Sequence, residues 1–144
     1  MQIHCIKPDN TWNLVVGRSP RNKLSKQSRA LKMSPSFTVY FNDEKQWIDV
    51  YLEDVSQEQF RENGGGDWGY FLATWEHPEH GEFGVLHFVK SILSNETIVH
   101  EVFHAVVELA RSRGETINED NEEDYACVAH ELFGKIQREL RKLA

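Results

Sequence analysis

Cysteine is scarce in this chain. Only Cys5 and Cys127 are present, and they lie far apart in the sequence. Neither has the close spacing of a disulfide-rich domain or of a cysteine-ligated zinc site, so the sequence argues against both classes. We expect two reduced cysteines that pack as small apolar residues.

Long apolar runs are also missing. No segment approaches the roughly 20 consecutive apolar residues that a bilayer span requires. The first twenty residues lack the basic start and apolar run of a secretory signal. The sequence therefore predicts a cytoplasmic protein with no membrane partner. With 40% hydrophobic and 27% charged residues over 144 positions, the chain predicts one globular domain spanning residues 1–144.

Charge is distributed unevenly. Residues 1–36 contain seven Lys or Arg and one acid, Asp9, so their net charge is +6. The whole chain has a net charge of −7, so residues 37–144 carry −13. A basic segment of this kind can bind nucleic acid or an acidic partner. No aromatic residues interleave with residues 17–32 to stack on bases, so we favour a surface segment that balances an acidic body. Nucleic-acid binding stays the less favoured alternative.

Alternating apolar and polar residues predict a sheet in the first two thirds of the chain. Two short strands, "QIHCIK" and "TWNLVVG", precede a linker or short helix in residues 17–36. The segment "SFTVYFNDEKQWIDVYL" predicts a hairpin with a four-residue turn. Two further strands are predicted in "DWGYFLATWEH" and "EFGVLHFVKSIL", and Ser56 can cap a short helix between the two strand pairs. We expect a small antiparallel sheet.

Two helices are predicted in the last third. Ser94 or Asn95 caps the first, which runs through Arg113 and ends at Gly114. The second runs from about Glu122 to the C-terminus. Its apolar positions repeat every three or four residues: Tyr125, Ala129, Leu132, Ile136, Leu140 and Leu143. A sheet followed by two helices is an α+β arrangement.

The first of these helices contains the pattern His-Glu-x-x-His, in "IVHEVFHAVVELA". On a helix, His100 and His104 lie one turn apart on one face and can bind a single tetrahedral zinc. Glu101 is rotated by about 100° from His100, so it can lie beside the metal and take a proton from zinc-bound water. The alternative is a helix with ordinary histidines. Burying three polar groups without partners would cost about 1–3 kcal/mol each, so we favour zinc.

A catalytic zinc requires a third protein ligand. The extended pattern with a third histidine is absent, because positions 107 and 110 are Val and Ala. The ligand must come from elsewhere in the chain. The start of the last predicted helix offers five acids: Glu119, Asp120, Glu122, Glu123 and Asp124.

The segments "HEVFHA" and "NEEDYACVAHELFGKI" resemble the minimal thermolysin-type zinc peptidases called gluzincins, in particular small zincin-like proteins often encoded by bacteriophages. The resemblance covers residues 98–136 and is only general before residue 85. It implies a zincin-like fold, a zinc cofactor, His100 and His104 as ligands, and Glu101 as general base. A glutamate at the start of the second helix is the third ligand in this family, which implies Glu123.

Two alternatives to Glu123 remain. The apolar stripe of the last helix passes closer to Glu122 when it is counted at about 100° per residue. His130, in the middle of the same helix, is a less favoured ligand and more consistent with a surface residue.

The expected function is a zinc-dependent hydrolase, in the first place a peptidase that cleaves a peptide or protein substrate. The alternative is a catalytically inactive zincin-like interaction module with a structural metal. In zinc peptidases of this class an edge strand beside the zinc pairs with extended substrate. The strand "EFGVLHFVK" is the nearest in sequence, and Gly84 either admits the substrate backbone or marks a bulge or turn end.

Two further residues have weaker predicted roles. His87 is interpreted as a strand-surface histidine, with hydrogen-bond donation to the reacting group as the less favoured alternative. Glu108 lies one turn beyond His104 and can orient a ligand imidazole.

Overall fold

A computed structural model describes residues 34–144. The chain divides between Ser34 and Pro35, and the unit with the predicted site is Pro35–Ala144. The two predicted N-terminal strands, the basic residues 17–32 and Cys5 lie outside the described residues. So does the part of the single-domain prediction that concerns residues 1–33.

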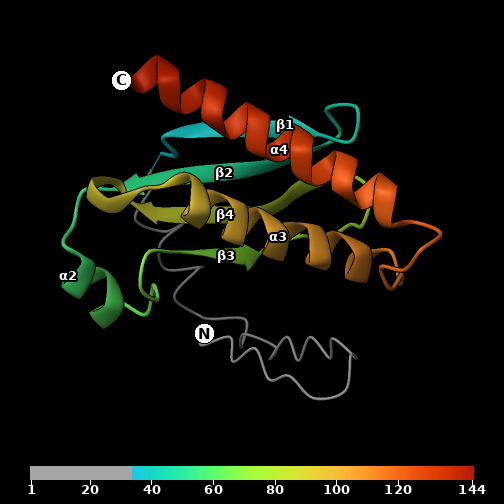
Figure 1. Cartoon of the computed structure of the whole chain (residues 1–144), viewed down its shortest axis with the longest axis horizontal. Helices are drawn as coiled ribbons and strands as arrows, with labels where there is room; N and C mark the ends of the chain where they lie inside the picture. Colours follow the sequence, from blue (N-terminus) through green and yellow to red (C-terminus); the bar gives the residue numbers. More distant parts are fainter. Residues whose placement is uncertain (1–33) are drawn as a thin grey trace. The chain divides into compact units, whose positions relative to one another are not determined.

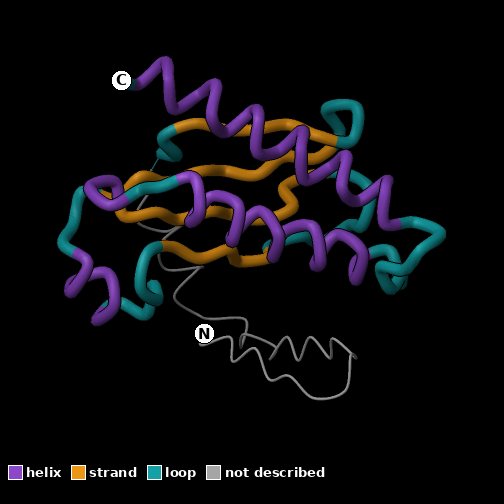
Figure 2. The backbone as a smooth tube through the Cα atoms, in the orientation of Figure 1, coloured by secondary structure: helices purple, strands orange, loops and turns teal. Residues whose placement is uncertain are grey.

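The described unit is α+β, as predicted (Figures 1 and 2). Its elements in chain order are β1 (Phe37–Phe41), β2 (Gln46–Glu53), α2 (Gln57–Glu62), β3 (Gly69–Ala73), β4 (Gly81–Val89), the short 3-10 helix η1 (Lys90–Ile92), α3 (Asn95–Ser112) and α4 (Glu122–Leu143). Every strand and helix predicted between residues 36 and 144 is present.

The four strands form one mixed sheet in the order β1-β2-β4-β3. β1 pairs with β2 and β3 with β4 in antiparallel fashion, whereas β2 and β4 are parallel. The prediction of an antiparallel sheet is therefore wrong for the central pair. After β2 the chain passes through α2 and enters the sheet at its edge as β3. The β3–β4 hairpin then brings β4 back between β3 and β2, in the direction of β2.

Helices α3 and α4 cover the same face of this sheet (Figure 1). α3 packs against β3 and α4 against β1, and the two helices pack against each other. Alternate strand residues such as Val39, Ile48 and Leu86 point into the core between the layers. On α3, Ile98, Val102, Ala105, Val106 and Leu109 repeat at helical spacing and are buried in the same core.

Local signals define the helix ends. The Ser94 hydroxyl accepts a hydrogen bond from the Thr97 amide at 3.2 Å and caps α3, as predicted. Gly114 follows the helix with φ +69°, a left-handed conformation that glycine adopts without strain. Ser56 caps α2 through a complete capping box.

The two long helices run antiparallel. The Gln137 side chain, late in α4, donates a hydrogen bond of 2.9 Å to the side chain of Asn95, the first residue of α3. At the other end, the Arg113 guanidinium lies 5.9 Å from the ring centroid of Tyr125, early in α4. The start of α4 therefore lies beside the end of α3.

Candidate metal and catalytic site

The histidines of α3 converge on one point. The Nε2 atoms of His100 and His104 are 3.2 Å apart, and their ring planes are inclined by 72°. Two nitrogens at about 2.0–2.1 Å from a tetrahedral zinc are separated by roughly 3.3–3.4 Å. The pair therefore has the spacing of two ligands of one zinc ion.

Solvent access and protonation at this pair are suited to metal binding. The His100 side chain is 57% exposed, so the shared point is open to water. Burial, and then the neighbouring His100, lower the pKa of His104. A lowered pKa favours the neutral imidazole, which is the form that binds a metal.

Glu101 lies next to the histidine pair but is buried. The residue is only 6% exposed, and its Oε1 atom is 4.0 Å from Nε2 of His100. Burial raises the pKa of the Glu101 carboxyl to about 7, although a hydrogen bond from the Phe71 backbone acts in the opposite direction. A carboxyl with a pKa near 7 both accepts and releases protons at neutral pH.

The strand beside this site is β3, not β4. Phe71, the hydrogen-bond partner of Glu101, belongs to β3, which forms one edge of the sheet. β4 lies between β2 and β3 and is paired on both sides. The prediction that the strand nearest in sequence pairs with substrate is therefore wrong, because the β3–β4 hairpin places the earlier strand at the edge.

Gly84 makes room for the neighbouring strand. A Cβ atom at Gly84 would lie 2.4 Å from the Phe71 ring and 2.7 Å from the Leu72 carbonyl oxygen. The pairing of β2 with β4 also shifts at this point, with Phe83 as the extra residue. Of the two interpretations of Gly84, the structure confirms the bulge.

The described part of the chain does not bring a third ligand to the histidine pair. Within residues 34–144, no three His, Cys, Asp or Glu residues gather as a metal-binding group. Glu122 and Glu123 are exposed in the first turn of α4, and the Glu123 carboxylate lies 4.0 Å from Cys127 Sγ. The Arg113 guanidinium lies over Tyr125 of this turn. Arg113 follows His104 by about 13 Å along the α3 axis, at about 1.5 Å per helical residue.

The proposed ligand roles on α4 thus remain predictions. Glu123 and its alternative Glu122 lie in the first turn of α4, beside the C-terminal end of α3. The exposed His130 lies further along α4. Cys127 is free, as expected, but it is exposed rather than buried.

Glu108 has partners other than the histidines. Its Oε1 atom accepts a hydrogen bond of 3.1 Å from the Trp75 indole, and its Oε2 atom pairs with Arg111 at 2.9 Å. The predicted orientation of a ligand imidazole by Glu108 is not seen. Instead this carboxylate ties α3 to the loop after β3.

An exposed apolar surface lies around the histidines and was not predicted from the sequence. Val99 is 53% exposed and Phe103 is 52% exposed, and both lie on the α3 surface next to His100. Large apolar side chains with this exposure beside a polar site are typical of binding surfaces. The sequence signal for this surface is that a large apolar residue, Val99 or Phe103, directly precedes each histidine of the pattern.

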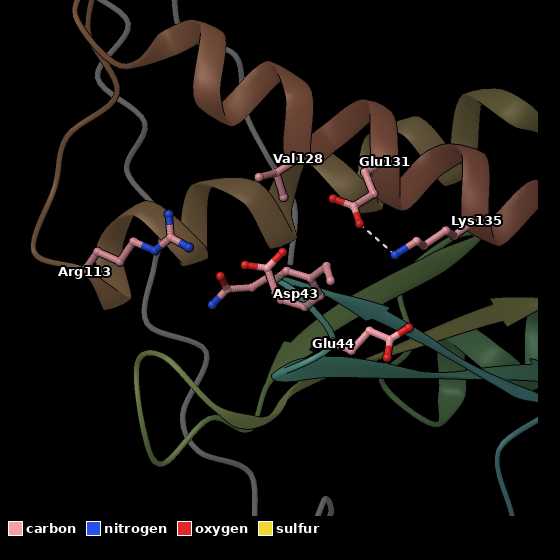
Figure 3. Close-up of a pocket in the computed structure, with 8 residues that line it drawn as sticks. Asp43, Glu44, Arg113, Val128, Glu131 and Lys135 are labelled. Atoms are coloured by element: carbon pink, nitrogen blue, oxygen red, sulfur yellow. Dashed lines mark hydrogen bonds and ion pairs between the residues drawn. The ribbon is translucent and has the colours of Figure 1, made fainter.

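A separate concavity of about 250 Å³ lies between the β1–β2 turn and α4 (Figure 3). The turn residues Asn42, Asp43 and Glu44 all have left-handed backbone conformations. On the α4 side, Lys135 forms an ion pair of 2.6 Å with Glu131. None of the predicted site residues lines this concavity, so it is distinct from the histidine site.

Comparison with known proteins finds no matching family model, no matching curated protein and no matching solved structure. Among residues 34–144, no helix is both long and apolar enough to cross a membrane.

Proposed function

We propose that this chain is a zinc-dependent hydrolase, in the first place a peptidase, with His100 and His104 as zinc ligands and Glu101 as general base. The observation that carries the proposal is the 3.2 Å separation of the two Nε2 atoms, with the buried Glu101 carboxyl beside them. The exposure of His100 favours an open catalytic site over a closed structural one.

The arrangement of strands around α3 supports a zincin-like interpretation of the fold. The helix with the His-Glu-x-x-His pattern packs against β3, the edge strand of a four-stranded mixed sheet. The Val89 amide donates to the Trp68 carbonyl at 3.2 Å, so residues 68, 70 and 72 direct their backbone groups at β4. Residues 69, 71 and 73 direct theirs away from β4, and an extended substrate can pair with these groups except for the Phe71 amide, which donates to Glu101.

Zinc bound at His100 and His104 would supply a water molecule with a pKa near 7 and would polarise a substrate carbonyl. In this proposal the Glu101 carboxylate takes a proton from the attacking water and delivers it to the amine that leaves. The Phe71 amide holds this carboxylate in place. Val99 and Phe103 contact an apolar substrate side chain beside the cleaved bond.

The proposal is tested by Glu101→Gln in the full chain, with hydrolysis of a quenched fluorescent peptide mixture as the readout. Loss of the general base should lower turnover by about 10²–10⁴-fold, while zinc content and folding are retained. Glu96→Gln is the matched control, because Glu96 is exposed in the first turn of the same helix. Turnover in Glu101→Gln equal to that of the parent would overturn the mechanism.

A further inference from the structure

Two large apolar side chains on the solvent side of α3 are open to water. Val99 is 53% exposed and Phe103 is 52% exposed. They are four residues apart on the helix, so they lie one turn from each other on the same side. Exposed apolar side chains grouped in this way are typical of surfaces that another protein covers. We call the surface around them the helical face and define it by six exposed residues: Glu96, Val99, Phe103, Arg111, Glu123 and Arg141.

Phe103 lies at the level of the middle of α4. The two helices are antiparallel, with Asn95 beside Gln137 and Arg113 beside Tyr125. Counting eight residues forward from Asn95 and eight back from Gln137 places Phe103 opposite residue 129. Counting ten back from Arg113 and ten forward from Tyr125 places it opposite residue 135. Helix α4 spans residues 122–143, so both levels are near its centre.

On α4, charge changes sign along the helical face. The first turn is acidic and contains Glu122, Glu123 and Asp124, whereas the last turn is basic and contains Arg141 and Lys142. Glu123 and Arg141 are 18 residues apart (141 − 123), which is about five helical turns, so they lie on the same line along the helix. The acidic and basic ends of α4 therefore belong to one exposed surface.

On α3, charge also changes sign about the level of Phe103. Glu96 is in the first turn and Arg111 is in the last turn. Glu96 precedes Phe103 by seven residues and Arg111 follows it by eight, so the two charges are at nearly equal distances on either side of the ring. The helical face thus has an apolar centre and, on each helix, ends of opposite charge.

We propose that the helical face docks on the helical face of a second copy of this chain, about a two-fold axis that crosses the helices at the level of Phe103. In this arrangement Glu123 faces Arg141 of the partner copy, and Glu96 faces Arg111 of the partner copy. The two Phe103 rings meet at the axis. A two-fold axis along the helices would instead place like charges on each other, so the charges select the crossing axis.

This contact also covers the candidate site. His100 directly follows Val99, and its side chain is 57% exposed on the same helix. In the dimer the histidine pair is shielded, and the monomer is the form that is open to substrate. This consequence rests on the proposed hydrolase function, whereas the dimer itself requires neither zinc nor turnover.

The test is sedimentation velocity of the full chain with a chelator present, over protein concentrations from about 1 to 100 μM. The parent should pass from monomer to dimer. Phe103→Ser should weaken the dimer at least about tenfold, because one buried ring is lost from each copy. Trp68→Ser is the matched control, since Trp68 is 55% exposed but lies before β3, outside the helical face. It should dimerise as the parent does.

Two charge-reversed proteins test the orientation. Glu122→Lys with Glu123→Lys makes both ends of α4 basic, and Arg138→Glu with Arg141→Glu makes both ends acidic. Each protein alone should dimerise at least about tenfold more weakly, because like charges then meet at both ends of the interface. An equimolar mixture should restore dimers with the affinity of the parent, since every basic end again meets an acidic one.

Three results would overturn the proposal. The first is a parent that stays monomeric over this range. The second is a mixture that stays monomeric although circular dichroism shows both charge-reversed proteins folded. The third is a dimer that forms only when zinc is added, which would assign the contact to a metal bridge between histidine pairs. Absence of hydrolysis would leave these measurements unchanged, because they are made without metal or substrate.

Discussion

Glu101 on α3 accepts a hydrogen bond from the backbone amide of Phe71 on β3. This bond joins the helix that carries the candidate zinc ligands to the edge strand of the sheet. The same carboxyl is therefore part of the fold and the candidate base. A glutamine at this position retains a carbonyl oxygen for the Phe71 amide but does not ionise, so Glu101→Gln separates the two roles.

The first prediction concerns the pH dependence of stability in the metal-free protein. Burial raises the pKa of Glu101 to about 7 from the ordinary value of 4.5. The folded state then binds this proton more tightly than the unfolded state. The contribution to stability is complete below pH 4.5 and is lost as the pH rises through 7, by about 3 kcal/mol at 1.36 kcal/mol per unit.

Urea unfolding with a chelator present, at several pH values between about 4.5 and 8, measures this effect. The parent should lose stability relative to Glu101→Gln as the pH rises, because only the parent must ionise a buried carboxyl. Parallel profiles for the two proteins would contradict the assigned burial of Glu101.

The second prediction concerns zinc affinity. Removing one imidazole of the converging pair, in His104→Ala, should weaken zinc binding by more than about a hundredfold, since even loss of an outer partner of a ligand costs roughly 10–100-fold. His130→Ala is the control, because His130 is exposed on α4. Competition with a chromophoric chelator gives both affinities. Equal values for His104→Ala and the parent would remove the basis of the metal site.

Local features of this fold were predictable from the sequence. The hairpin turn at Asn42 and the caps at Ser56 and Ser94 depend on residues close together in the chain, whose side chains and backbone decide the conformation by themselves. The His100 and His104 convergence belongs to the same class, because helix geometry alone fixes a spacing of four residues.

Non-local relationships were not predictable. The apolar pattern identified β4 as a strand but did not identify β2 as its neighbour. A strand with apolar residues on both faces can pair with any other strand of the sheet, so the pattern does not choose between them. The partner of Glu101 is an amide of Phe71, and the partner of Glu108 is the Trp75 indole. Both depend on which strand occupies the sheet edge, and a single sequence does not specify that.

The third prediction concerns the missing ligand. Glu123→Gln should weaken zinc binding at least about tenfold and Glu122→Gln should not, if the resemblance to gluzincins extends to this position. Because the first turn of α4 lies beside Arg113, zinc binding by Glu123 requires that turn to move toward His104. Zinc titration should then shift the amide signals at the start of α4. The reverse order of the two variants would assign the ligand to Glu122.

The last prediction tests the packing that places β3 at the edge beside α3. Gly84→Ala would put a Cβ atom 2.4 Å from the Phe71 ring and 2.7 Å from the Leu72 carbonyl oxygen. Because one of these contacts is backbone, the strand must shift, and the free energy of unfolding should fall by about 1–3 kcal/mol. The displaced Phe71 also holds Glu101, so turnover should fall along with stability.

Gly134→Ala is the matched control for this change. A Cβ atom at Gly134, inside α4, would come no closer than 3.7 Å to another residue, the Arg138 guanidinium. Alanine is favoured over glycine in a helix interior, so this variant should gain about 0.5–1 kcal/mol. Thermal unfolding of both variants measures the contrast. If Gly84→Ala were as stable as the parent, Phe71 would not be packed against β4 at this position, and the location of the edge strand beside Glu101 would be wrong.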